Sequence, residues 1–181
     1  QMCIRDSLIK YLSAHSAEVY NDNPRDFLNF INEGITERIN SGFVTGLAGH
    51  FGTRQKNGDR KLILSHAGHR QVLVYRKKEN AVELVELPNG TVMGLPGTTA
   101  SRAKAIDLQI GDRFYAFTDG IVEASNPKGE EFGTKRVMDT FKSLSSKPVQ
   151  KTVEGLYNKV AKFTQVPDQQ DDISIIGFEL N

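Results

Sequence analysis

The chain has 181 residues, a length that suits one domain with a sizeable core. Its 23 basic and 22 acidic residues leave a net charge of +1, so no global field would recruit nucleic acid or an anionic membrane. The single cysteine, Cys3, excludes an internal disulfide and fits a reducing cytosol, and no apolar run reaches the roughly 18 residues of a membrane span. We therefore expect a soluble domain.

The first seven residues, Gln1 to Ser7, do not begin with an initiator methionine and continue no periodic pattern. They are similar to the short adapter-derived tails that assembled sequences sometimes carry. We expect this heptapeptide to be foreign and the native chain to continue upstream. Residues 8 to 181 contain no internal repeat, low-complexity stretch or linker, which favours a single domain.

Helical patterns come first. Leu8 to Tyr20 indicates a weakly patterned helix. In the next helix Asn23 can serve as the cap, Pro24 suits the first helical position and Gly42 can end the helix. Its apolar face is predicted to comprise Phe27, Phe30, Ile31, Ile35 and Ile39.

Strand patterns follow, separated by turn residues such as Asn57-Gly58-Asp59 and Asn89-Gly90. The cluster Arg76-Lys77-Lys78 is interpreted as a solvated hairpin tip. The predicted strands span Phe43 to Phe51, Lys61 to His66, Val72 to Arg76, Val82 to Leu87, Ala103 to Leu108 and Arg113 to Phe117.

After Phe132-Gly133 the pattern becomes helical again, with Thr134 as the cap of one helix and Pro148 at the start of another. Their inner faces are predicted to be Val137, Met138, Phe141 and Leu144, then Val149, Val153, Leu156, Val160 and Phe163. A last strand, Ile173 to Phe178, has polar groups only near its ends, so we expect it to lie centrally in a sheet. Antiparallel hairpins with helices grouped outside them indicate an α+β domain.

Two acidic motifs stand at predicted strand ends, Thr118-Asp119-Gly120 and Asp171-Asp172. A carboxylate held on a rigid strand end is pre-oriented for a hard divalent cation such as Mg²⁺ or Mn²⁺. Gly120 fits this interpretation, because a residue without a Cβ lets the backbone turn sharply and lets a phosphate approach. Each motif also has a simpler interpretation, since Asp-Gly is typical of hairpin turns and paired aspartates often protect a sheet edge.

A third motif, His66-Ala67-Gly68-His69, falls at a predicted hairpin. A zinc site there would need further ligands from Cys3, His15 or His50, whose spacings match no known pattern, so we expect local hydrogen bonds to hold these histidines. The next residue, Arg70, carries a planar guanidinium that suits phosphate oxygens. An exposed loop arginine without that role is the alternative.

The order of these motifs resembles the SpoIIE-like branch of the metal-dependent (PPM-type, 2C-class) serine/threonine protein phosphatases. The resemblance implies an antiparallel β-sandwich flanked by helices in α-β-β-α layers, with a metal site at one edge. The helices from Leu8 to Asn40 would pack on one sheet and those from Thr134 to Gln165 on the other. The matching motifs are Phe43-Val44-Thr45, Ala67-Gly68-His69, Met93-Gly94-Leu95, Ile110-Gly111-Asp112-Arg113, the run Phe117 to Ala124, Phe132-Gly133 and Asp171-Asp172-Ile173-Ser174.

The resemblance implies hydrolysis of phosphoserine or phosphothreonine in a protein, with two Mn²⁺ or Mg²⁺ ions held by Asp119 and Asp171. Gly120, His69 and Asp172 would support this site, with His69 in a nearby loop and Asp172 on the opposite face of its strand. Arg70 would contact the substrate phosphate.

Two divalent ions bring four positive charges, whereas Asp119 and Asp171 supply two negative ones. In the family the missing ligands come from an early acidic strand and from an aspartate followed by Gly-His-Gly, a motif that this chain lacks. We therefore expect residues 8 to 181 to be the C-terminal portion of such a domain, with its first strands missing. The chain as written is then expected to be inactive.

The family typically acts in the bacterial cytoplasm on a STAS-type anti-sigma-factor antagonist, often below an upstream sensor or receiver domain in a longer chain. A dimer is compatible with this interpretation. Two other classes stay open, namely a pseudophosphatase that serves as a protein-binding regulatory module, and a plain structural β-sandwich.

Overall fold

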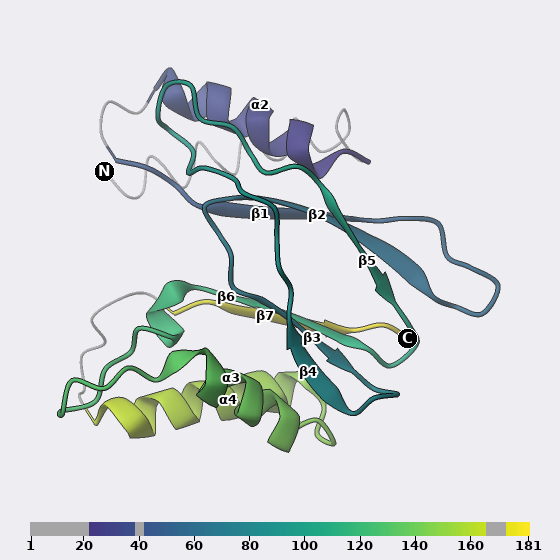
Figure 1. The fold of residues 1–181 in the computed structure, drawn as a ribbon, viewed down its shortest axis with the longest axis vertical. Helices are drawn as coiled ribbons and strands as arrows, with labels where there is room; N and C mark the ends of the chain where they lie inside the picture. The colour runs from purple at the N-terminus through teal and green to yellow at the C-terminus, as the bar shows by residue number, and fades with distance from the viewer. Residues whose placement is uncertain (1–21, 39–41, 166–172) are drawn as a thin grey trace. The chain divides into compact units, whose positions relative to one another are not determined.

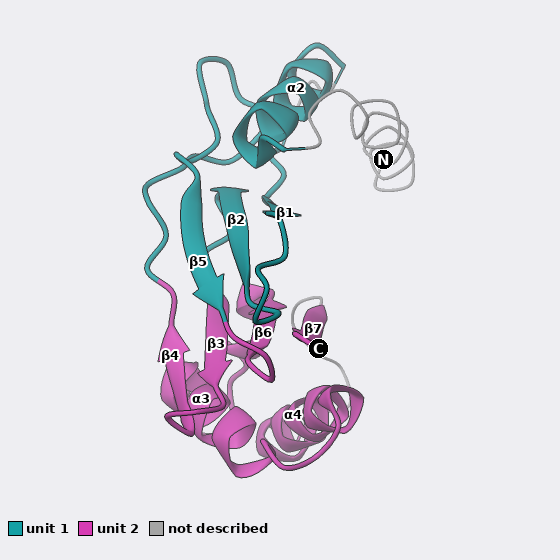
Figure 2. Ribbon diagram, turned by 90° about the vertical axis from the view of Figure 1, so that its right-hand side faces the viewer, with its two compact units in different colours: residues 1–70, 86–108 teal, residues 71–85, 109–181 magenta. Residues whose placement is uncertain are grey.

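The computed structural model describes residues 22–38, 42–165 and 173–181. The chain divides into two compact units, with residues 1–70 and 86–108 in unit 1 and residues 71–85 and 109–181 in unit 2 (Figure 1, Figure 2). The predicted helix Leu8 to Tyr20 lies outside the described residues.

Unit 1 consists of one helix and an antiparallel sheet. Helix α2 (Pro24–Thr36) begins as predicted, because the Asp26 backbone N–H donates to Asn23 Oδ1 (3.4 Å) and Pro24 occupies the first turn. The sheet has the order β1-β2-β5, and its strands are β1 (Gly46–Phe51), β2 (Arg60–Ala67) and β5 (Lys104–Leu108). The core between helix and sheet comprises Leu28, Ile31, Ile35, Ala67, Met93 and Ala100.

Two asparagines of α2 fasten a loop of unit 1 onto the helix. Asn32 is buried, its Nδ2 donates to the Thr98 carbonyl (2.8 Å), and its Oδ1 accepts from the Gly94 N–H (2.7 Å). Asn29 Oδ1 accepts from the Ala100 N–H (2.8 Å). The loop backbone thus finds in the helix side chains the hydrogen-bond partners that a buried segment needs.

Unit 2 contains a four-stranded antiparallel sheet in the order β4-β3-β6-β7. Helix α3 (Gly133–Ser143) contacts β3 and β4, and α4 (Val149–Thr164) contacts β7, so both helices cover this sheet (Figure 1). The strands are β3 (Val72–Arg76), β4 (Ala81–Leu84), β6 (Arg113–Phe117) and β7 (Ile175–Glu179).

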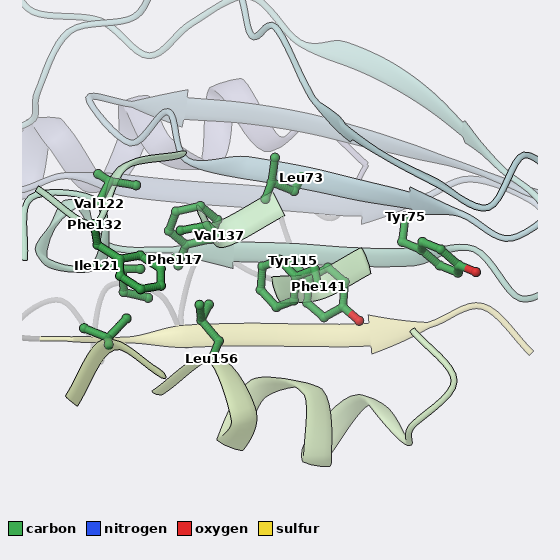
Figure 3. Packing of buried hydrophobic residues seen from close by; sticks show 11 residues of the cluster. Leu73, Tyr75, Tyr115, Phe117, Ile121, Val122, Phe132, Val137, Phe141 and Leu156 are labelled. Atoms are coloured by element: carbon green, nitrogen blue, oxygen red, sulfur yellow. The ribbon is translucent and has the colours of Figure 1, made fainter. Parts of the chain in front are cut away.

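Aromatic packing on β6 forms the centre of the core of unit 2. All five residues of β6 are buried. The Tyr115 and Phe141 rings stack with centroids 3.9 Å apart, and Phe117 meets Phe141 at 6.4 Å with tilted planes (Figure 3). Such ring pairs add about 0.5–1.5 kcal/mol each to the stabilisation from buried area. The core therefore fixes the direction of β6 and of the turn that follows it.

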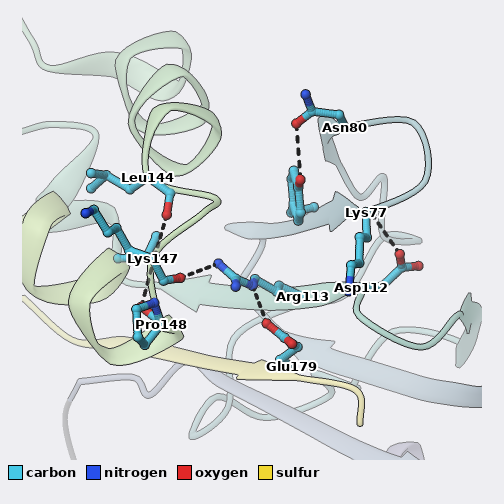
Figure 4. Close-up of polar contacts among 10 residues, drawn as sticks. Lys77, Asn80, Asp112, Arg113, Leu144, Lys147, Pro148 and Glu179 are labelled. Carbon is cyan, nitrogen blue, oxygen red and sulfur yellow. Dashed lines mark hydrogen bonds and ion pairs between the residues drawn. The ribbon is translucent and has the colours of Figure 1, made fainter.

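A buried carboxylate organises the other end of β6. Asp112 is 2% exposed, and its Oδ1 accepts from the Lys77 N–H (3.0 Å) (Figure 4). Its Oδ2 accepts from the Gln109 N–H (3.1 Å) and from Arg76 Nη1 (3.0 Å). The Asp112 carbonyl also accepts from the Leu180 N–H (3.0 Å). One side chain therefore joins the β3–β4 hairpin to the turn before β6, which explains the Gly-Asp motif structurally.

The predicted α+β class is confirmed, and the strands Val72–Arg76 and Arg113–Phe117 have the predicted bounds. Helix α2 packs on the sheet of unit 1, and α3 and α4 pack on the sheet of unit 2, as expected. Other boundaries differ. Val44 forms only an isolated bridge with Met93 before β1, and the helix α2 ends at Thr36 rather than near Gly42. The strand predicted over Val82 to Leu87 is β4 (Ala81–Leu84), and the strand predicted over Ile173 to Phe178 is β7 (Ile175–Glu179).

Three local predictions were wrong. Ala67-Gly68-His69 is not a hairpin, because β2 and β3 belong to different sheets. Thr134 lies inside α3 and Phe132 holds the cap position without a side-chain bond. Among the described strands β7 stands at the end of its sheet rather than centrally. Ile175 packs against the core of unit 2 and Gly177 lies close to Val149 of α4, whereas Ile176 is exposed.

Replacing Asp112 tests its structural role. Asp112→Asn would remove the negative charge beside Arg76 and replace one accepting oxygen with an NH₂ group that faces at least one N–H donor. We expect a loss of about 3 kcal/mol in the free energy of unfolding, measured by urea denaturation. The control Asp107→Asn changes an exposed carboxylate that pairs with Lys61 and should cost at most about 1 kcal/mol. Equal losses in the two variants would contradict this role.

Candidate functional site

Asp119 lies where the buried strand β6 ends. Thr118 is still extended, and the chain then forms a short 3₁₀ turn over Asp119–Ile121 whose Gly120 and Ile121 are buried. Ile121 belongs to the core of unit 2 (Figure 3). The Asp119 side chain is exposed and has no hydrogen-bond or ion-pair partner among the described residues. A rigid backbone therefore presents a carboxylate to solvent, and the hairpin-turn alternative for Asp-Gly does not apply here.

The start of the last strand is bonded to the residue before Asp119. The Thr118 N–H donates to the Ser174 carbonyl (3.1 Å), and the Ser174 N–H donates to Thr118 Oγ1 (3.0 Å). The strand register continues this pairing, with Phe117 opposite Ile175. The structure thus places Ser174, which follows Asp171 by three residues in the sequence, beside the Asp119 turn.

Asp171 and Asp172 themselves lie outside the described residues. Their convergence with Asp119, and the outward orientation expected for Asp172, stay predictions. The pairing of Thr118 with Ser174 was not anticipated from the sequence. A threonine before Asp119 and a serine after Asp171-Asp172 were visible there, but nothing local indicates that they bond to each other.

The donor chemistry at Asp119 fits a hard divalent cation, because an exposed carboxylate without a competing partner is a suitable oxygen ligand. One carboxylate does not complete a site. In residues 22–38, 42–165 and 173–181, no group of three or more His, Cys, Asp or Glu side chains is arranged to hold a metal ion. The described part of the chain therefore offers one candidate ligand, the Asp119 carboxylate.

Hydrogen bonds within the segment hold the loop between the Asp119 turn and α3 in one conformation. The Glu123 N–H donates to the Asp119 carbonyl (3.0 Å) and the Gly133 N–H to the Val122 carbonyl (2.9 Å). At the tip, Asn126 Oδ1 accepts from the backbone N–H groups of Lys128 (2.9 Å) and Glu130 (3.0 Å). This loop leads the chain from the Asp119 turn into α3 as an ordered structure.

His66 has a structural role in unit 1. It is fully buried, and its Nε2 lies 2.7 Å from the Pro88 carbonyl, to which a neutral ring can donate. Ser101 N–H donates to the His66 carbonyl (2.7 Å), and Gly90 is required there because a Cβ would lie 2.6 Å from the same oxygen. Burial lowers the pKa of His66, and the nearby positive charge of Arg70 adds to the shift. His66 is therefore a neutral core histidine. It is held by hydrogen bonds, as the sequence predicted.

His69 and Arg70 follow in the loop after β2. His69 is half-buried, and Arg70 is exposed with its Nη2 donating to Asn89 Oδ1 (2.6 Å). Gly68 turns the chain with φ +75°, where a Cβ would lie 2.8 Å from Val92 Cγ1. Both residues belong to unit 1 whereas Asp119 belongs to unit 2, so their predicted proximity to the Asp119 site stays a prediction.

Comparison with known proteins identifies the family. The model of the family described as Stage II sporulation protein E (SpoIIE) matches residues 4–181, and the chain therefore belongs to the SpoIIE family. No curated protein sequence matches the chain. Within the described residues, no helix is both long and apolar enough to cross a membrane.

Solved structures show the same fold. The SiaA-PP2C domain of Pseudomonas aeruginosa matches with TM-score 0.68 and 17% identity over 98% of this chain and 69% of that chain. The phosphatase domain of Bacillus subtilis SpoIIE, presoaked with Mn, gives TM-score 0.61 and 16% identity over 96% and 73%. The catalytic domain of the phosphatase PstP, in complex with two manganese ions, gives 0.63 and 12% over 96% and 79%. The fold is that of PP2C-like phosphatase domains, as the resemblance predicted.

The lowered pKa of His66 predicts a pH dependence of stability. The unfolded chain takes up a proton near pH 6.5 that the folded chain excludes, so stability is full above that pH and falls as the pH drops through it. The slope reaches at most about 1.4 kcal/mol per pH unit. We expect urea midpoints of His66→Gln, which keeps a donor for Pro88, to depend less on pH between 7.5 and 5.5 than those of the native chain. Parallel pH profiles would contradict this assignment.

Proposed function

We propose that the chain is the C-terminal portion of a metal-dependent phosphoserine/phosphothreonine protein phosphatase domain, with Asp119 and Asp171 as metal ligands and catalytic residues. The observation that carries the proposal is the exposed Asp119 carboxylate at the end of a buried strand, in a chain of the SpoIIE family. The pairing of Thr118 with Ser174 supports Asp171 as the second ligand, since it brings the segment that follows Asp171 to the Asp119 turn.

Two Mn²⁺ or Mg²⁺ ions would supply Lewis-acid activation of water and neutralise the phosphoryl oxygens. Asp119 would present its carboxylate to the ions in one orientation. The turn that carries it is restricted, because Ile121 packs in the core and the Glu123 N–H donates to the Asp119 carbonyl. Gly120 has no Cβ and would therefore leave room for a phosphate beside the backbone. Asp172 would act as a loop or backbone partner. The remaining negative charge would come from upstream residues, so the chain as written is proposed to be inactive.

Arg70 and His69 would act on the substrate side. The contact from Arg70 to Asn89 uses one guanidinium nitrogen and leaves the side chain exposed, so further N–H groups are available to phosphate oxygens. His69 would lie in the same loop without binding the ions. These roles require unit 1 to contribute to the site of unit 2.

The proposed substrate is a phosphorylated STAS-type anti-sigma-factor antagonist in the bacterial cytoplasm, with an upstream sensor or receiver domain regulating the phosphatase in a longer, dimerisation-competent chain. This part rests on the family to which the chain belongs. The near-neutral net charge of +1 gives no support for a nucleic acid as the partner.

A pseudophosphatase, acting as a protein-binding regulatory module, is the second candidate. It is favoured by one observation, which is that no group of three or more His, Cys, Asp or Glu side chains is arranged to hold a metal ion within the described part of the chain. Release of phosphate from an aryl phosphate, measured with Mn²⁺ on the chain joined to its upstream sequence, separates the candidates. Turnover supports the phosphatase, and its absence together with absent Mn²⁺ binding supports the module.

Removing the Asp119 charge should weaken metal binding. Isothermal titration of the native chain with Mn²⁺ is expected to show saturable binding, and Asp119→Asn should lower the affinity at least about tenfold. The control Asp139→Asn changes an exposed aspartate on α3 that pairs only with Lys135. If Asp119→Asn and Asp139→Asn bind Mn²⁺ equally well, Asp119 is not a ligand.

The Thr118 hydroxyl should act as a positioning group. Thr118→Val removes the acceptor for the Ser174 N–H, whereas Thr118→Ser keeps it. Because one such hydrogen bond contributes about 1 kcal/mol, we expect the valine variant to lose about fivefold in Mn²⁺ affinity and the serine variant to stay close to native. Similar losses in both variants would point to packing of the threonine methyl group instead.

A further inference from the structure

A polar pocket lies in unit 2, at the opposite end of β6 from Asp119. Its volume is about 330 Å³, and its lining includes Lys77, Asn80, Arg113, Ser145, Ser146 and Glu179. These residues come from the β3–β4 hairpin, from the start of β6, from the loop between α3 and α4, and from the end of β7 (Figure 4). Every one of them belongs to unit 2, so the pocket is formed within one compact body.

Arg113 forms the fixed floor of this pocket. Its side chain is 10% exposed, its Nε donates to Glu179 Oε2 (2.6 Å), and its Nη1 donates to the Lys147 carbonyl (2.9 Å) (Figure 4). The guanidinium carbon also lies 5.9 Å from the centroid of the Tyr75 ring. Three contacts therefore hold the guanidinium in place. The ion pair also neutralises the charge of Glu179, which is the one acidic residue in the pocket lining.

Lys77 adds a positive charge that has no counterion among the described residues. Its side chain lies over Gly111, which has φ +86°, and a Cβ at that glycine would collide with the Lys77 chain. The glycine thus makes room for the lysine at the pocket wall. With Arg113 balanced by Glu179, the charged groups that line the pocket sum to +1.

The neutral groups of the pocket are mainly hydrogen-bond donors. The Tyr75 hydroxyl donates to Asn80 Oδ1 (3.1 Å), so the acceptor of that amide is already occupied. The hydroxyl groups of Ser145 and Ser146 make no hydrogen bond within the described part of the chain. The pocket therefore offers one lysine, one buried guanidinium and two hydroxyls around a single neutralised carboxylate.

From this arrangement we propose that the pocket binds a phosphate-class oxyanion. Multiple donors with a net positive charge match the acceptor-only surface of a phosphate group, and charge-assisted hydrogen bonds are the stronger kind. The volume stands at the lower end of the roughly 300–1,000 Å³ range of small-molecule sites, which suits free phosphate or the phosphate group of a small metabolite. Binding here is independent of Asp119 and of the proposed phosphatase activity.

An NMR titration of the native chain tests the proposal. ¹H–¹⁵N spectra are recorded with sodium phosphate at constant ionic strength and with EDTA present, so that metal-dependent binding at Asp119 does not contribute. We expect saturable shifts of the backbone amides of Gly111, Ser145 and Ser146, with chloride at the same ionic strength giving none. Lys77→Gln should weaken the apparent affinity roughly threefold to fivefold, as expected for the loss of one exposed charge.

The neighbouring Lys78→Gln is the matched control, because Lys78 is exposed on the same hairpin and does not line the pocket. Equal affinities of the two lysine variants, or no saturable shift at Ser145 and Ser146, would overturn the proposal. A parallel titration with glycerol phosphate separates the two sources, since tighter binding than inorganic phosphate assigns the site to a phosphorylated metabolite and equal or weaker binding assigns it to free phosphate.

Discussion

Strand β6 is bonded at both ends to parts of the chain that are distant in sequence, and the rest of unit 2 depends on this arrangement. At its start the Asp112 carboxylate binds the β3–β4 hairpin, and at its end Thr118 pairs with Ser174. Between them, aromatic rings of β6 stack on α3. Because a buried strand cannot exchange these partners for water, its two ends are fixed places at which polar side chains can be presented.

The two ends present opposite chemistry. At the carboxyl end, Asp119 offers an anionic oxygen with no described partner, which suits a cation. At the amino end, Arg113 is held against Glu179 while Lys77 stays unpaired within the described part, which suits an anion. The separation follows from the strand itself, since its buried middle keeps the two charged regions from compensating each other.

Buried polar groups inside the two units fix the conformation of loops. His66, Asn32 and Asp112 are each buried, and each holds backbone groups of a loop that would otherwise be unsatisfied. Such a group is costly to bury without its partners, so only one arrangement of the loop is acceptable. Loop anchoring by buried polar groups therefore adds to apolar packing in defining the structure of each unit.

From the sequence alone came the α+β class, the bounds of Val72–Arg76 and Arg113–Phe117, the Asn23 cap and the place of Asp119 after the end of a strand, because these features follow from local periodicity and turn chemistry. The tertiary structure alone showed that β7 lies at the end of its sheet among the described strands and that the Ala67-Gly68-His69 segment passes from one sheet to the other. It alone also showed the roles of Asp112 and Thr118. Each of these depends on pairing between residues far apart in the chain, such as Thr118 with Ser174, and no local pattern encodes which distant backbone a strand or carboxylate will meet.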